Sequence, residues 1–186
     1  VIVAVATAVP AGLVLGQSPA LNRIFSPFIY IIYPIPKIVF LPIILLFLGV
    51  GDRSKIFIIA LILFFQVLVV VRDEAGGIRP ELLYSVRSLG AGRRALFRFV
   101  YLPATLPAVL TALRVSVGTA VAVLFFAESF ATTSGLGYYI IVESWGRLAY
   151  PEMYAGVVAM SVLGLMLYFI IDRLERWLCP WLFVER

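Results

Sequence analysis

The sequence predicts an all-α, polytopic membrane protein: a bundle with five transmembrane helices in this chain. Hydrophobic residues fill 63% of the 186 positions and charged residues only 13%, whereas soluble domains carry roughly 25% charged residues. The mean hydropathy is +1.08. The apolar residues fall into long runs separated by short polar segments, and helices are the ordinary way for such runs to satisfy their backbone in lipid.

The first two apolar runs differ in their small residues and prolines. Residues 1–16 form a span of marginal length, since crossing the hydrocarbon takes roughly 20 residues. Its small residues are of the kind that membrane helices place at close contacts: Ala4, Ala6, Ala8, Ala11 and Gly12. Residues 24–50 contain prolines that each remove a backbone donor and clash with the preceding turn: Pro27, Pro34, Pro36 and Pro42. A broken or strongly kinked helix is therefore predicted, and its irregular backbone makes it a candidate wall of a transport path.

Three further runs complete the predicted bundle: residues 56–71, 104–127 and 153–171. As a continuous helix, the run from 104 to 127 would be about 36 Å long. The chain starts at Val1 within an apolar run, without the charged leader of a signal peptide. We therefore expect residues 1–186 to be a single transmembrane domain that is incomplete at its N-terminus, with about six helices in the intact subunit.

The long polar stretch from Arg79 to Pro107 predicts a helix-turn-helix, with residues 79–100 as a loop outside the hydrocarbon. Pro80 suits a first helical turn, and Glu81 complements the exposed amide dipoles there. Apolar residues recur at helical spacing on one face: Leu82, Val86 and Leu89. Gly90 favours termination of this helix. A second short amphipathic piece alternates arginines with apolar residues: Arg93, Arg94, Leu96, Phe97, Arg98 and Val100.

The distribution of charge predicts the orientation. Arginines crowd the stretch before and within this loop, which places it in the cytoplasm: Arg72, Arg79, Arg87, Arg93, Arg94 and Arg98. Alternation then puts Arg23 and the C-terminal tail inside, and the turn 51–55 and the connection 128–152 outside. The outer connection holds Glu128, Glu143 and Glu152 against Arg147. The net charge of +5 thus follows the membrane rule and does not indicate nucleic-acid binding.

The spacing of Gly90, nine residues, Val100, one residue, Leu102 and Pro103 resembles the signature loop of bacterial ATP-binding-cassette (ABC) importer permeases. That pattern runs E-A-A, three residues, G, nine residues, I-x-L-P. Here its first three positions are Tyr84, Ser85 and Val86, so the acidic residue is absent and only the second half matches closely. The alternative is a basic juxtamembrane loop without a partner.

Four further segments look like the nitrate, taurine and alkanesulfonate branch of these permeases: residues 34–56, 102–118, 126–140 and 174–181. The branch also includes bicarbonate and thiamine-precursor permeases. The resemblance implies a multi-pass subunit of the bacterial inner membrane, paired with a second permease subunit as a homodimer or pseudo-dimer. It also implies cytoplasmic ATPase subunits and an extracytoplasmic solute-binding protein, in addition to contact with membrane lipid.

The residue types argue against an enzyme or a metal protein. The chain has no histidine and one cysteine, Cys179, so the commonest acid–base and metal-ligating groups are lacking. It also lacks the G-x-x-x-x-G-K-[ST] loop of nucleotide-hydrolysing motors. We therefore expect no catalytic site, metal or cofactor in this subunit, and ATP hydrolysis on its partner.

The coupling role implied by the resemblance falls on the helix before Gly90 and the start of the next one. A helix docked in a groove needs apolar anchors and a polar rim. The candidate residues are Glu81, Leu82, Leu83, Tyr84, Ser85, Val86, Arg87, Leu89, Gly90 and Arg93. The competing interpretation is that the leucines pack against helices of the same subunit.

Two cations are predicted at depth in the membrane, Lys37 and Arg114, each roughly 13 to 17 Å from the cytoplasmic end of its run. Charges at such depth are costly and tend to face a pore or a partner. With Gln66, Ser116 and Thr119 as neutral hydrogen-bonding groups, they are candidates for a path that favours a small anion. Alternatively, the cations cap carbonyls freed by nearby prolines, and the neutral groups join helices.

Other classes of function remain open. An ion-coupled secondary transporter would show inverted repeats and membrane-embedded acidic sites, and we see neither in the sequence. The same ABC machine could also carry a neutral, thiamine-precursor-like solute. An intramembrane enzyme would need paired carboxylates, histidine or a nucleophile elbow.

Overall fold

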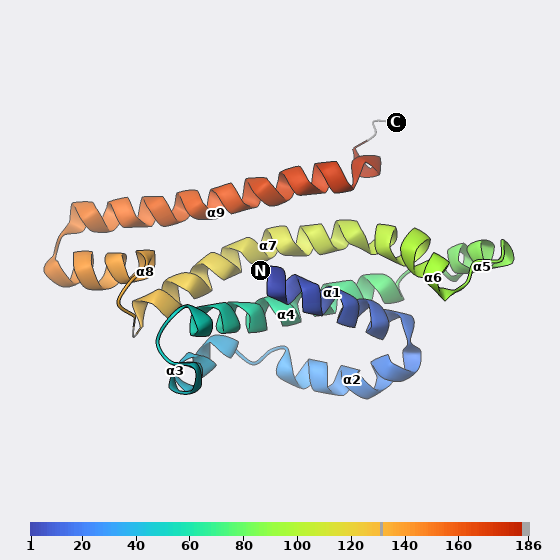
Figure 1. The fold of residues 1–186 in the computed structure, drawn as a ribbon, viewed down its shortest axis with the longest axis horizontal. Helices are drawn as coiled ribbons and strands as arrows, with labels where there is room; N and C mark the ends of the chain where they lie inside the picture. Colours follow the sequence, from blue (N-terminus) through green and yellow to red (C-terminus); the bar gives the residue numbers. More distant parts are fainter. Residues whose placement is uncertain (131, 184–186) are drawn as a thin grey trace. The chain divides into compact units, whose positions relative to one another are not determined.

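The computed structural model describes residues 1–130 and 132–183, which are largely helical and contain no strand. The all-α prediction is confirmed. In chain order the elements are α1 (Ile2–Gln17), α2 (Pro19–Ile32), η1 (Lys37–Phe40), α3 (Leu41–Leu48), α4 (Asp52–Gly76), α5 (Pro80–Ser88), α6 (Arg93–Leu96), η2 (Phe97–Tyr101), α7 (Leu102–Ser129), α8 (Leu136–Tyr138), η3 (Tyr139–Ser144), η4 (Trp145–Arg147), α9 (Tyr150–Leu178) and η5 (Pro180–Leu182) (Figure 1).

Within the described residues, three helices are long and apolar enough to cross a membrane: α4, α9 and the continuous helix from Arg93 to Ser129. The pair formed by α2 and η1–α3 counts as a fourth span if its two halves are taken together. Helix α1 is apolar but only 16 residues long. The chain is a multi-pass membrane protein, and a separate fifth crossing by α1 stays a prediction.

The break predicted within residues 24–50 is confirmed. A break separates α2 from η1–α3, and the segment that joins them contains Pro34 and Pro36. Pro42 lies in the first turn of α3, where no intrahelical bond is lost. Pro27 remains inside α2, so only the closely spaced pair of prolines interrupts the helix.

The described residues form two compact units, each with its own core. Unit 1 comprises residues 36–63 and 114–170 with Val1, and its buried core residues are Leu41, Ile44, Ile58, Val123 and Ala127. Unit 2 comprises residues 2–35, 64–113 and the chain from Ile171 onward. Its buried core includes Ala8, Leu13, Leu15, Ile29, Val67, Leu68, Val71, Ala75, Leu96, Val100, Tyr101 and Val109.

Small residues let α1 pack closely on α4 within unit 2. Ala4, Ala8 and Gly12 are buried at intervals of four residues, which places them on one helix face. A Cβ atom on Gly16, the next member of this series, would lie 2.6 Å from the carbonyl oxygen of Arg72. The predicted contact role of the small residues is thus confirmed for this stripe, whereas Ala6 points away and is exposed.

The helices extend beyond the predicted apolar spans. Helix α4 continues to Gly76, and α7 reaches Ser129. The outer connection predicted for 128–152 contains three short helical elements, α8, η3 and η4. The apolar run in a sequence indicates only the part of a helix that lies in lipid. The helix itself continues for as long as its backbone hydrogen bonds can form.

Candidate functional site

The loop helix α5 begins and ends where its sequence predicts. Pro80 occupies the first turn with Glu81 beside it, and the last helical residue is Ser88. Gly90 has φ of +84°, a left-handed conformation that favours glycine. Its N–H donates to the carbonyl of Arg87 at 2.9 Å. The chain therefore turns sharply before α6 starts.

Helix α5 has two apolar faces. Leu83 and Val86 pack against the core of unit 2. Leu82 and Leu89, the residue that follows the helix, are 48% and 87% exposed, and Tyr84, on another side of α5, is 63% exposed. The packing interpretation therefore holds for Leu83 and Val86, whereas a docking role for the exposed leucines stays a prediction.

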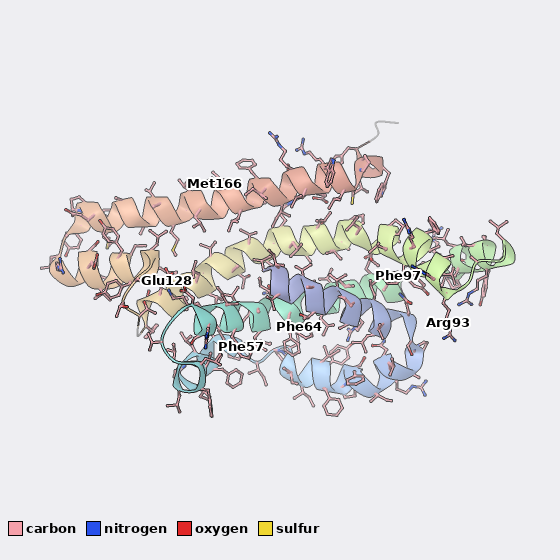
Figure 2. The ribbon with its side chains drawn as sticks, viewed as in Figure 1. Phe57, Phe64, Arg93, Phe97, Glu128 and Met166 are labelled. Carbon is pink, nitrogen blue, oxygen red and sulfur yellow. The ribbon has the colours of Figure 1, made fainter. Side chains whose placement is uncertain are left out.

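The residues that replace E-A-A do not form a common surface. Tyr84 is exposed, Val86 packs inward, and the hydroxyl of Ser85 donates to the carbonyl of Glu81 at 2.8 Å. Arg87 and Arg93 are exposed and line a polar pocket together with the turn between α1 and α2. Figure 2 labels Arg93 at this end of unit 2.

A helical connection joins the loop directly to the membrane. The π-helix η2 continues α6 into α7, and the N–H of Leu102 donates to the carbonyl of Phe97, five residues earlier. The buried hydroxyl of Thr105 donates to the carbonyl of Tyr101 at 2.8 Å. The result is one continuous helix of 37 residues from Arg93 to Ser129.

The candidate path residues fall in both units. Lys37 and Ser116 are buried, and Arg114, Thr119 and Gln66 are half-buried. All belong to unit 1 except Gln66. The guanidinium carbon of Arg114 lies 5.7 Å from the ring centroid of Tyr168 in α9, a cation–π contact within unit 1. A role of these residues in transport stays a prediction.

A buried ion pair in unit 1 corrects the prediction that Glu128 belongs to an outer loop. Glu128 lies in the last turn of α7, and its Oε1 is 3.2 Å from Nζ of Lys55, with side chains 9% and 10% exposed. Lys55 also donates to the carbonyl of Ser134 at 3.4 Å. The second carboxylate oxygen of Glu128 accepts the N–H of Gly137 at 3.0 Å.

The backbone around Glu128 leaves no room for additional side chains. Gly135 has φ of +118°, which favours glycine. A Cβ atom on Gly137 would lie 2.6 Å from the carbonyl oxygen of Phe125 and 2.7 Å from Cβ of Glu128. The sequence signal for this cluster was an acidic residue followed by two glycines, opposite a lysine in the other loop predicted on the same side.

Other reactive side chains do not gather into a site. Within residues 1–130 and 132–183, no three His, Cys, Asp or Glu side chains lie together in a way that could hold a metal ion. Cys179 follows α9 and is buried, and burial raises the pKa of its thiol. Such a thiol is kept in its less reactive, protonated form.

The fold is that of a multi-pass helical membrane protein. Its polar loop, residues 79–100, carries apolar side chains that lie outside the core of unit 2. The chain belongs to the family described as "Binding-protein-dependent transport system inner membrane component", whose profile matches residues 8–184. The resemblance stated from the sequence is confirmed, including the branch.

Curated relatives agree with this assignment, and a solved structure shares the fold. The chain is 34% identical to "Taurine transport system permease protein TauC" of Escherichia coli over 179 residues, 96% of this chain. It is 30% identical to "Formylaminopyrimidine transport permease protein ThiX" of Halalkalibacterium halodurans over 163 residues, 86% of this chain. It spans 64% of the length of each relative. A chain of the inward-facing MetNI methionine ABC transporter shares the fold, with a TM-score of 0.76, 20% identity and coverage of 95% of this chain and 88% of that one.

Proposed function

We propose that this chain is a permease subunit of an ABC importer in the inner membrane, with residues 79–100 as its coupling loop. It forms part of the path for a small anionic solute, which an extracytoplasmic solute-binding protein delivers. Cytoplasmic ATPase subunits hydrolyse ATP, and a second copy of the permease completes the path. The observation that carries this proposal is the exposed apolar pair of the loop, Leu82 in α5 and Leu89 directly after it.

The outer face of α5 has the composition of a docking helix. Helices that bind in grooves use apolar and aromatic anchors at helical spacing, surrounded by polar groups. Leu82 and Leu89 lie seven residues apart, with Glu81 and Arg87 exposed around them. Leu83 and Val86 meanwhile fix the helix to the core of unit 2, so force applied to the outer face is passed to the subunit.

Substitution of the outer anchors tests the coupling role. We expect the double variant Leu82→Ser with Leu89→Ser to weaken binding of the purified ATPase subunits about tenfold or more. Ser88→Ala is the matched control on the same helix, because Ser88 is exposed and its hydroxyl bonds only within α5. Unchanged ATPase affinity in the double variant would contradict docking through this face.

The proposal of an anionic solute depends on the charges of Lys37 and Arg114. Gln66, Ser116 and Thr119 would supply neutral hydrogen bonds. TauC is named for taurine, whose sulfonate group is an anion. In reconstituted transporter, Lys37→Gln and Arg114→Gln should each raise the solute concentration for half-maximal uptake about three- to tenfold. Arg23→Gln, in the polar segment predicted inside, is the charge-matched control. Loss of assembly, with no change in this concentration, would favour the structural role instead.

The name of ThiX favours a second cargo, a neutral pyrimidine derivative carried by the same machine. Binding of taurine, nitrate, bicarbonate and formylaminopyrimidine to the cognate solute-binding protein would separate the two cargo classes. An ion-coupled secondary transporter is the remaining alternative. Uptake that persists in vesicles without ATP, and collapses with the ion gradient, would replace the ABC proposal.

A further inference from the structure

Two pockets of opposite character meet within unit 2. The apolar pocket has a volume of about 550 Å³, and α1, α2 and α4 line it with Pro10, Ala11, Val14, Leu15, Leu21, Phe25, Phe28, Ile29, Ile32, Phe64, Phe65 and Leu68. The basic pocket has a volume of about 460 Å³ and is lined by Val14, Gln17, Ser18, Pro19, Arg87, Arg93, Leu96 and Tyr101. Val14 lines both, so the pockets adjoin near the C-terminal end of α1.

The lining of the apolar pocket matches hydrocarbon. Every side chain in it is apolar, and four are phenylalanines. Phe25 and Phe28 of α2 are 48% and 59% exposed, so this pocket opens on a helix face that residues 1–130 and 132–183 leave uncovered. Its volume lies in the range of ordinary ligand sites, roughly 300–1,000 Å³. In a membrane protein, acyl chains are the hydrocarbon that surrounds such a face.

The lining of the basic pocket matches an anionic headgroup. Arg87, Arg93, Gln17 and Ser18 are among its lining residues, and no acidic residue lines it. Arginine pairs bidentately with phosphate. Basic pockets between membrane helices on the cytoplasmic side are typical sites for anionic lipid headgroups.

We propose that one anionic phospholipid of the cytoplasmic leaflet occupies both pockets, with an acyl chain in the apolar pocket and its phosphate against Arg87 and Arg93. The site rests on the proposed function in one respect, the cytoplasmic placement of α5. Arg87 belongs to α5, Arg93 to α6, and Gln17 to the end of α1. The bound lipid therefore ties the coupling loop to the α1–α2 turn and makes the position of the loop sensitive to membrane charge.

The test uses photo-crosslinking in the assembled transporter with its full-length permease. The complex is placed in phosphatidylcholine nanodiscs that contain a small fraction of phosphatidylglycerol with a photoreactive acyl chain. We expect crosslinks at Phe25, Phe28 and Phe64, and about tenfold less crosslinking with an equal fraction of photoreactive phosphatidylcholine. Equal crosslinking by the two lipids, or crosslinks elsewhere only, would overturn the proposal.

Two variants locate the headgroup and the chain. Arg87→Gln with Arg93→Gln should reduce phosphatidylglycerol crosslinking about tenfold, whereas Arg94→Gln, which lines a different pocket, should leave it unchanged. Val14→Phe should block the junction and reduce crosslinking of both lipids, whereas Val3→Phe on the same helix should not. Val14 and Val3 are 53% and 55% exposed, so neither substitution disturbs the core. Equal effects of a variant and its control would contradict the assignment of that pocket.

Competition separates the lipid from other anions and from the ATPase. Millimolar inorganic phosphate should leave the crosslinks in place, because the acyl chain supplies part of the affinity. If phosphate displaces the lipid completely, the site is a free-anion site. If the double arginine variant loses ATPase affinity but keeps its crosslinks, the pocket belongs to the ATPase interface. If the permease binds no ATPase subunits but keeps its lipid crosslinks, the lipid site is upheld and the proposed function is refuted.

Discussion

Charged side chains are exposed in the loop around α5 and buried in the cluster around Glu128. At α5, the charged side chains are exposed and apolar side chains such as Leu89 stand beside them, 87% exposed. At Glu128, a carboxylate and an ammonium group are buried 3.2 Å apart, and a backbone N–H completes the site. The first region leaves apolar side chains exposed, and the second pairs its buried charges within the subunit.

This difference separates an interface from a structural joint. A buried charge is stable only when it is paired and hydrogen-bonded, so Lys55, Glu128 and Gly137 depend on one another. Exposed apolar groups on a loop make no such contribution to the fold of their own chain. Substitutions at the Glu128 cluster should therefore lower the free energy of unfolding strongly, and those at the exposed face of α5 only weakly. Four predictions follow, from the largest change to the smallest.

The largest loss is expected for Lys55→Met, which leaves Glu128 as an uncompensated buried charge. We expect the free energy of unfolding to fall by about 3–5 kcal/mol, measured by denaturant titration of the purified subunit in detergent. The double variant Lys55→Met with Glu128→Leu removes both charges and should be more stable than Lys55→Met alone. Additive losses in the double variant would show that the two side chains do not interact.

A smaller loss is expected where the glycines approach Glu128. Gly137→Ala places a Cβ atom against the carbonyl of Phe125, and such overpacking costs about 1–3 kcal/mol. Gly118→Ala is the matched control, because nothing lies within 4 Å of an added Cβ there and alanine suits a helix interior better. The same unfolding titration should show a loss for the first variant only; equal responses would contradict the tight packing.

On the inner face of α5, Leu83→Ser should lower the free energy of unfolding by about 1–2 kcal/mol, because a partly buried side chain is lost from the core of unit 2. Thermal unfolding of the purified subunit would measure it. If Leu83→Ser lowered the free energy of unfolding as much as Lys55→Met, the loop would contribute as much to stability as the Glu128 cluster, and the comparison would fail.

The smallest effect on stability is expected for the outer face of α5. Leu82→Ser and Leu89→Ser should each change the free energy of unfolding by less than about 0.5 kcal/mol, since both side chains are exposed. The same unfolding measurement checks this. A substantial loss in the isolated subunit would show that these leucines support its own fold, and would remove the main argument for a docking face.

Local features of the fold were predictable from the sequence because they depend on neighbouring residues. Pro80 and Gly90 mark the two ends of α5, and Pro34 and Pro36 mark the bend after α2. Proline and glycine act on the backbone at their own positions. Their effects therefore do not depend on how distant helices pack.

Contacts between distant segments were not predictable in the same way. Lys55 and Glu128 are 73 residues apart, and the sequence placed both only on the same side of the membrane. Similarly, spacing put Leu82, Val86 and Leu89 on one apolar face, whereas the core takes Leu83 and Val86. A helix with apolar residues on two faces does not indicate by periodicity which face its own subunit will cover.

The π-helical turn between Phe97 and Tyr101 gives the long helix a place where its register can change. Conversion of this turn to α-helical bonding would advance the chain by one residue and rotate the side chains beyond it by about 100°. A displacement of the loop would then rotate α7 about its own axis, and α7 would stay helical. Spin labels on opposite sides of the turn would detect this rotation, and a fixed angular distribution throughout the ATP cycle would exclude it.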